Sequence, residues 1–219
     1  MKTLFRIRLL AELLFLICIL WASYLLIKLS LPYIHFIPGV EFLVTKQLIY
    51  HIDWWRWSFY IHVFFSPIVI LSGLLQFVRR FAYTYPTFHR WTGKVYVFTV
   101  LFISGPSGLI MSFYANGGYP AQVSFVTLSC LWIISTYLGY HYARKKSFHK
   151  HLLWTFRSYA LTLSAVTLRF YAYLFDVFKV NLPPVEAYTT LAYLSWIPNL
   201  MVVQLLQKFG YIRSFLKKT

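Results

Sequence analysis

The chain has 219 residues, of which 59% are hydrophobic, 21% are aromatic and only 12% are charged. The charged share is about half that of a soluble domain, which excludes an ordinary soluble protein and indicates an integral membrane protein. The formal net charge is +16, but so apolar a chain cannot present a basic soluble surface, and we expect no nucleic-acid partner.

Six apolar runs are long enough to cross a bilayer, because about 30 Å of hydrocarbon needs roughly 20 helical residues. Within a single transmembrane domain of residues 1–219, the predicted spans cover 9–29, 58–78, 93–114, 121–142, 152–175 and 188–206. The first run is too long for the apolar region of a signal peptide, and no small-x-small cleavage pattern follows it. We therefore interpret it as a retained span.

The longest connection lies between the first two spans. Pro32 and Pro38-Gly39 interrupt helix there, and residues 41–57 then mix apolar and polar positions. This segment ends in Asp53-Trp54-Trp55-Arg56-Trp57, and tryptophan is enriched where the bilayer meets water. The pattern predicts an interfacial helix over about 41–57.

The positive charges predict the orientation of the chain. Six spans put both termini on one side, and that side carries 16 of the 21 lysines and arginines, whereas four of the five acidic residues lie on the other. The positive-inside rule makes the basic side cytoplasmic. We predict a protein of the bacterial inner (plasma) membrane with both termini in the cytoplasm, whose basic side binds anionic lipid head groups.

The two basic junctions between spans resemble each other. Gln76 precedes Arg79-Arg80 by three residues, as His141 precedes Arg144-Lys145; Phe88-His89-Arg90 leads into the third span, as Phe148-His149-Lys150 leads into the fifth. Chance similarity is the alternative to a repeat. If the repeat is real, spans 2–5 form a central four-helix bundle of two parallel hairpins. The predicted fold class is thus an all-α integral membrane protein with six transmembrane helices.

Several of these residues resemble a family of bacterial and fungal membrane proteins known as a domain of unknown function, DUF2306. The matching pieces are Gln76-Phe77 with Arg79 or Arg80, residues 89–96, Gly117-Gly118, residues 151–154, residues 157–169, Trp196 and Asn199. The resemblance covers roughly residues 60 to 200 and implies the fold, but no particular activity.

The second histidine motif departs from the family pattern. The family usually has two basic residues after this histidine, where the chain has Leu152 and Leu153. This leaves two candidates, His149 and His151, and the spacing to Trp154 and Arg157 favours His151. The family outline is also reminiscent of four-helix b-type cytochromes of the b561 kind, a likeness of fold alone.

Imidazoles and guanidinium groups recur at the predicted cytoplasmic ends of adjacent spans. Axial imidazoles from two helices with cations near the propionates would suit b-type haem in a helical bundle. We predict His89, His141 and His151 as ligands of haem iron or of another transition metal. Other candidate site residues there are Gln76, Arg79, Arg90 and Arg157. The alternative is that these side chains bind lipid phosphates at the interface.

Two further polar residues are predicted in the other half of the membrane. His62 lies about five residues inside the second span, and Arg169 lies seven residues before Asp176 in the fifth. A charged side chain at such depth is costly and marks function by default. Arg169 would bind an anionic group, such as a haem propionate, a quinone or an acidic substrate; the alternatives are snorkelling and pairing with Asp176.

Three functions follow from these patterns, and whether the protein is an enzyme stays open. The first is a membrane-bound redox protein that binds haem b and exchanges electrons with a quinone or a redox partner. The second is a small proton- or anion-coupled transporter that uses His62 and Arg169. The third is a non-catalytic accessory subunit.

Overall fold

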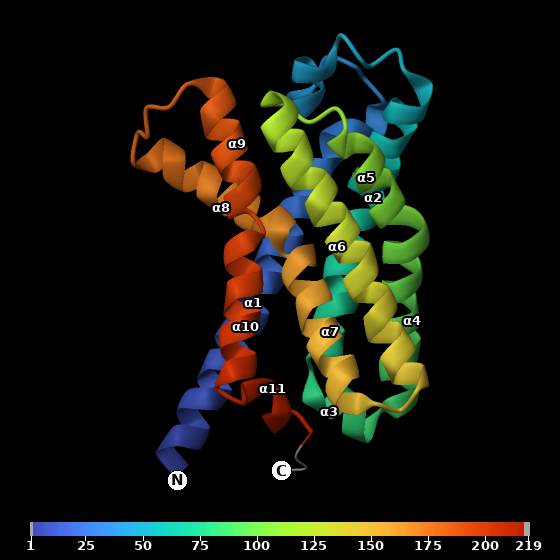
Figure 1. Cartoon of the computed structure of the whole chain (residues 1–219), viewed down its shortest axis with the longest axis vertical. Helices are drawn as coiled ribbons and strands as arrows, with labels where there is room; N and C mark the ends of the chain where they lie inside the picture. The colour runs from blue at the N-terminus through green and yellow to red at the C-terminus, as the bar shows by residue number, and fades with distance from the viewer. Residues whose placement is uncertain (1, 217–219) are drawn as a thin grey trace.

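The computed structural model of the chain describes residues 2–216, with the side chains of all but 2–9, 11, 12, 15, 79, 80 and 214. The described residues form helices and contain no β-strand (Figure 1). The longer helices are α1 (Lys2–Ser30), α2 (Asp53–Gln76), α4 (Pro86–Phe98), α5 (Gly105–Ser112), α6 (Gly118–Arg144), α7 (Phe148–Thr162), α8 (Ser164–Val177), α9 (Pro184–Leu194) and α10 (Ile197–Lys208). The shorter ones are η1 (Leu31–His35), η2 (Glu41–Lys46), α3 (Arg79–Thr84), the π-helical η3 (Thr99–Ser104) and α11 (Tyr211–Ser214).

Within the described residues, five helical stretches are long and apolar enough to cross a membrane. They are the end of α1 with η1, then α2, α4 through α5, α6, and α9 with α10. Helices α7 and α8 make a sixth if they count as one span, although they meet at an angle of 41°. The prediction of an all-helical membrane protein is therefore confirmed, with five spans or six.

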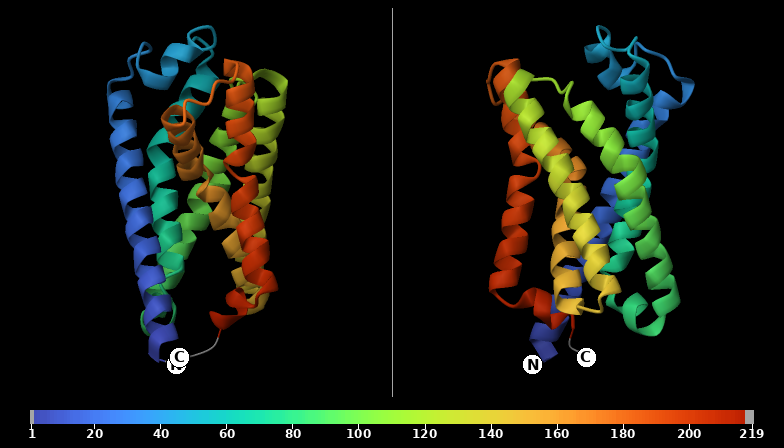
Figure 2. Two further views of the ribbon diagram at one scale, coloured as in Figure 1. Left: turned by 90° about the vertical axis from the view of Figure 1, so that its left-hand side faces the viewer. Right: turned by 45° about the vertical axis from the view of Figure 1, so that its right-hand side comes forward.

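Helices α2, α4–α5, α6 and α7 pack on one another. Helix α6 runs along α7, α2 packs against α4, η3 and α5, and α5 also packs on α6 (Figures 1 and 2). The centre of these contacts is almost fully buried: Val69, Ile70, Val100, Tyr159 and Leu161 are each at most 3% exposed. Helix α1 lies outside against α2, and α10 lies outside against α7.

Three spans are interrupted within their length. In the span from α4 to α5, Pro106 has no amide hydrogen to donate to the preceding turn, and η3 is π-helical just before it. A Cβ atom at Gly105 would lie 2.3 Å from the Val100 carbonyl oxygen, so only glycine fits this turn.

Side-chain hydrogen bonds connect the break between α7 and α8 to the break between α9 and α10. The Asn199 Nδ2 donates to the carbonyl oxygens of Ala160 and Ser195 and to Thr167 Oγ1, each at 3.1 Å. The Thr167 hydroxyl donates to the Ser195 carbonyl. These bonds satisfy carbonyls that the helix breaks release, as a break inside a membrane requires.

The segment from Leu31 to Ile52 covers one end of the molecule. It contains η1 and η2 rather than one interfacial helix over 41–57, and Asp53 already begins α2. The physical reason is that Asp53 lies at the helix N-terminus, where an acidic side chain is favourable, and Trp55 is 1% exposed and anchors the first turn.

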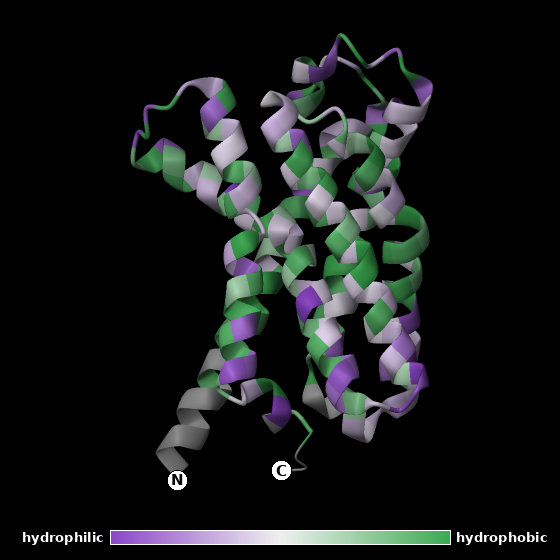
Figure 3. Cartoon of the chain, in the orientation of Figure 1, coloured by the Kyte–Doolittle hydropathy of each residue, from purple (hydrophilic) through white to green (hydrophobic). Residues whose placement is uncertain are grey.

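The opposite end consists of α3, the start of α4, the α6–α7 turn and α11, and we call it the basic end. The beginning of α1 and the described C-terminal residues lie at this end (Figures 1 and 2). Hydrophilic residues gather there on α4, α6 and α7, whereas the middle of these helices is largely hydrophobic (Figure 3).

Candidate functional site

A cavity of about 380 Å³ opens at the basic end between α2, α4, α6 and α7. Such a volume is at the lower end of the range of small-molecule sites, about 300–1,000 Å³. Its lining residues are Gln76 from α2; His89, Arg90, Gly93, Lys94, Tyr96 and Val97 from α4; Thr136, Gly139, Tyr140, Ala143 and Arg144 from α6; Lys146 from the turn; and His151, Thr155 and Ser158 from α7.

Two imidazoles from different helices share this cavity. His151 Nδ1 lies 2.8 Å from the Gly139 carbonyl oxygen, which fixes the ring as a donor at Nδ1 and leaves Nε2 with a lone pair. His89 Nδ1 is buried without a hydrogen-bond partner among the described residues. The two rings are close enough to interact electrostatically. His89 and His151 thus place two imidazole rings, each a possible metal ligand, in the same cavity.

The mouth of the cavity is strongly basic. Four exposed cationic side chains line it: Arg90, Lys94, Arg144 and Lys146. None of the described lining residues carries a carboxylate. The mouth therefore favours an anionic ligand group, and the arginines can bind carboxylate or phosphate in a bidentate manner.

The inner wall of the cavity ends in a buried network of hydroxyl groups. The Tyr96 hydroxyl lies 2.6 Å from Ser158 Oγ and 2.9 Å from Thr162 Oγ1, and Thr136 Oγ1 lies 2.6 Å from Ser158 Oγ. The Trp132 indole N–H donates to Thr162 Oγ1 at 2.9 Å. The cavity thus passes from charged groups at its mouth, through imidazoles, to neutral hydroxyls.

Helical phase explains which residues face the cavity. On α7, His151, Thr155 and Ser158 follow the i, i+4, i+7 spacing of one helix face. On α4, Tyr96 likewise lies seven residues after His89. Tyr96, Thr155 and Ser158 were not predicted as site residues, although this spacing from the two histidines identifies them.

The structure brings four predicted site residues together: Gln76, His89, Arg90 and His151 all line the cavity. Gln76 also links α2 to α4, since its Nε2 donates to Thr92 Oγ1 at 2.8 Å.

His141 and Arg157 do not line the cavity. Because α6 faces the cavity with residues 136, 139, 140 and 143, His141 falls off that face and stacks on Tyr137, with ring centroids 5.9 Å apart. The Arg157 guanidinium stacks on the Trp154 ring at 4.5 Å. The side chain of Arg79 lies outside the described residues. No group of three or more His, Cys, Asp or Glu side chains able to hold a metal occurs in the described part of the chain.

His62 and Arg169 lie away from this cavity. His62 Nδ1 is 2.9 Å from the Ser104 carbonyl oxygen, and its ring packs against Gly108, where a Cβ atom would come within 2.9 Å of the ring. His62 thereby joins α2 to η3 and α5. Arg169 lies on α8 and donates from Nη1 to the Ala165 carbonyl oxygen at 2.7 Å.

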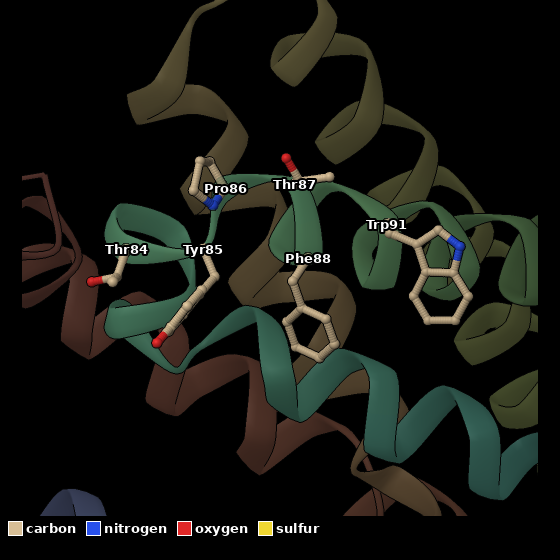
Figure 4. A pocket seen from close by; sticks show the side chains of 6 residues that line it. All are labelled: Thr84, Tyr85, Pro86, Thr87, Phe88 and Trp91. Carbon is tan, nitrogen blue, oxygen red and sulfur yellow. The ribbon is translucent and has the colours of Figure 1, made fainter.

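A second hollow lies on the outside of the α3–α4 turn. It has a volume of about 570 Å³ and is lined by Thr84, Tyr85, Pro86, Thr87, Phe88 and Trp91 (Figure 4). Among its described lining residues, Tyr85 carries the only titratable group, and none is a cation. Its aromatic, exposed walls are typical of a surface at the membrane interface.

The comparisons with known proteins identify one family. The model of the family described as "Predicted membrane protein (DUF2306)" matches residues 59–207, more than half of the chain, and this range includes every residue of the cavity. No curated protein and no solved structure matched the chain. The family resemblance read from the sequence is confirmed, and the chain belongs to the DUF2306 family of predicted membrane proteins.

Proposed function

We propose that the protein is a membrane-bound electron-transfer protein that binds b-type haem in the cavity at the basic end. The observation that carries the proposal is that His89 and His151, from different helices, share one cavity. Haem in helical bundles is held by imidazoles from two helices. When bound, haem supplies one-electron chemistry, and the chain supplies its ligands, its surroundings and its orientation.

The surroundings of the two histidines fit this role. Histidines that bind metals commonly donate their other ring N–H to a carbonyl or carboxylate, which orients the ring, and the Gly139 carbonyl offers this support to His151. His89 brings a buried ring nitrogen, Nδ1, that has no hydrogen-bond partner in the described part of the chain. These two residues replace the predicted set of three, because His141 faces away from the cavity.

The cations at the mouth fit the two propionates of haem. Arg90 and Arg144 lie on different helices and can each pair with a carboxylate, and Lys94 and Lys146 add positive charge beside them. These cations would hold the propionates at the mouth of the cavity, and the neutral hydroxyl network would line its inner end. A quinone or a redox partner at the basic end would exchange the electron.

The charge distribution supports an orientation for this site. By the positive-inside rule, we assign the basic end to the cytoplasmic face of a bacterial inner membrane, with both termini inside and anionic head groups around it. We further propose that α2, α4–α5, α6 and α7 are a four-helix bundle of two parallel hairpins. In that repeat, His89 is equivalent to His149 near the starts of α4 and α7, and His151 lies two residues further along α7.

The experiment is a visible spectrum of the purified full-length protein with single-residue variants. Protein produced with an ample haem supply is expected to show a Soret band and, after reduction, the α and β bands of b-type haem. His89→Ala and His151→Ala are each expected to abolish the low-spin spectrum. His141→Ala is the matched control, since this nearby histidine does not line the cavity, and it should keep the spectrum.

Two results would contradict the proposal. One is a colourless, folded protein that takes up no added hemin. The other is a haem spectrum that survives both His89→Ala and His151→Ala, which would put the ligands elsewhere. Size-exclusion profiles of all variants establish that each remains folded.

A further inference from the structure

Arg169 is an exposed cation within a membrane-spanning part of the chain. It lies near the middle of α8, and no residue of α8 is buried. Helix α8 departs from the direction of α7 by 41°, and the ribbon shows it leaving the packed helices before α9 returns beside α6 (Figures 1 and 2). Arg169 is therefore carried by a helix at the edge of the packed helices.

No carboxylate neutralises this guanidinium among the described residues. Among the described residues, the ion pairs are Arg56 with Asp53 and Lys179 with Asp176. Pairing with Asp176, one of the two alternatives considered for Arg169, is not formed; Asp176 contacts Lys179 at 3.0 Å instead. Of the five N–H donors of a guanidinium, the described contacts use one, towards the Ala165 carbonyl.

The side chain lies within electrostatic range of η1 and α2. Arg169 is close enough to interact electrostatically with Tyr33, in η1 at the end of α1, and with His62 on α2. Neither can neutralise it: the Tyr33 hydroxyl accepts from the Phe42 amide at 3.2 Å, and the His62 Nδ1 is engaged with the Ser104 carbonyl. Positive charge therefore remains unbalanced in the half of the molecule opposite the basic end.

We propose that Arg169 binds the phosphate group of a membrane lipid between α8 and α1. A guanidinium next to hydrocarbon is costly unless an anion accompanies it, and its planar donors match phosphate oxygens. The neighbouring side chains favour a lipid over a soluble anion, because Phe170 and Tyr173 on α8 are 54% and 64% exposed and offer apolar surface to acyl chains. This inference does not depend on the proposed haem site.

The test measures thermal unfolding of the full-length protein in neutral-detergent micelles with added lipid. Phosphatidic acid is compared with diacylglycerol of the same acyl chains, which lacks only the phosphate. Phosphatidic acid is expected to raise the unfolding temperature of the wild type, and diacylglycerol is not. In Arg169→Gln the apparent affinity for phosphatidic acid should fall about tenfold or more, the factor typical of one charge-assisted hydrogen bond.

Matched variants keep the test decisive. Lys179→Gln removes another exposed cation of the same region and should respond to phosphatidic acid as the wild type does. Arg169→Lys keeps the charge without the planar donors and should respond to an intermediate degree. Because Arg169 is exposed, both substitutions at this position should leave the protein folded.

Three outcomes would overturn the proposal. They are an unchanged response to phosphatidic acid in Arg169→Gln, an equal response to diacylglycerol, and an equal response to inorganic phosphate, which would assign the anion to solution. The Soret band, if present, should be the same in wild type and Arg169→Gln, so failure of this proposal and failure of the haem proposal are distinguishable.

Discussion

Lys46 is a buried cation without an acidic partner in the described structure. Its side chain is 5% exposed, and its ammonium group donates to the Tyr114 carbonyl and to Asn116 Oδ1, both at 2.5 Å. Burial lowers the pKa of Lys46 to about 8. The residue fastens the segment that covers one end of the molecule to the α5–α6 turn, and the sequence alone gave no sign of this role.

The lowered pKa predicts a stability that increases with pH. In the unfolded chain Lys46 should titrate near 10.4, whereas in the folded protein it loses its proton near pH 8. Between these two pKa values the unfolded state binds more protons than the folded state does. The free energy of unfolding therefore rises from about pH 8 upwards, and it is lower at pH 7 than at higher pH. The unfolding temperature should therefore increase more between pH 7 and pH 9.5 in the wild type than in Lys46→Met.

Lys28 offers the control for this measurement. It is an exposed lysine near the same end of the molecule, and Lys28→Met should keep the gain of the wild type. Equal gains in wild type and Lys46→Met would show that Lys46 is not the titrating group.

The sequence predicts individual elements unevenly. Long apolar runs indicate the helices because hydrocarbon selects for length and hydrophobicity, and Gly105-Pro106 indicates where the span from α4 to α5 is irregular. The bend between α7 and α8 has no such signal, since the break at Leu163 contains neither proline nor glycine. It depends on tertiary hydrogen bonds from Asn199, which lies on another helix.

Asn199 should therefore contribute measurably to stability. In Asn199→Leu the carbonyl oxygens of Ala160 and Ser195 lose a partly buried donor, and we expect a loss of about 1–3 kcal/mol in the free energy of unfolding. Denaturant unfolding in micelles checks this value. Gln204→Leu, at an exposed amide on the same helix, should change stability far less; a similar loss in both variants would contradict the role given to Asn199.

At the scale of the whole molecule, the sequence predicts which end holds the site better than which residues form it. The concentration of basic residues places Gln76, His89, Arg90 and His151 at one end, where they share a cavity. It cannot separate His141 from this group, because only the rotation of α6 about its axis decides which side chain faces inward. The proposed repeat stays a prediction: Gln76 lines the cavity, whereas His141, its counterpart in the repeat, does not.

The orientation of the whole chain can be measured by cysteine labelling. Cys18 and Cys130 are both free and can be replaced by serine. In that background, Asn181→Cys lies in an exposed loop at the end opposite the basic end, and Lys145→Cys lies in the exposed α6–α7 turn. A membrane-impermeant thiol reagent applied to intact bacterial cells should label only Asn181→Cys. Labelling of only Lys145→Cys would reverse the topology.

The four cations around the cavity mouth make ligand entry sensitive to ionic strength. Exposed charges attract an approaching anion over distances that shrink from about 30 Å in 0.01 M salt to about 8 Å in physiological salt. An anionic ligand should therefore associate more slowly as salt is added. Once it lies beside the imidazoles it is shielded from the solution ions, and its dissociation rate should change much less. The protein would capture its ligand by long-range attraction and retain it by short-range contacts.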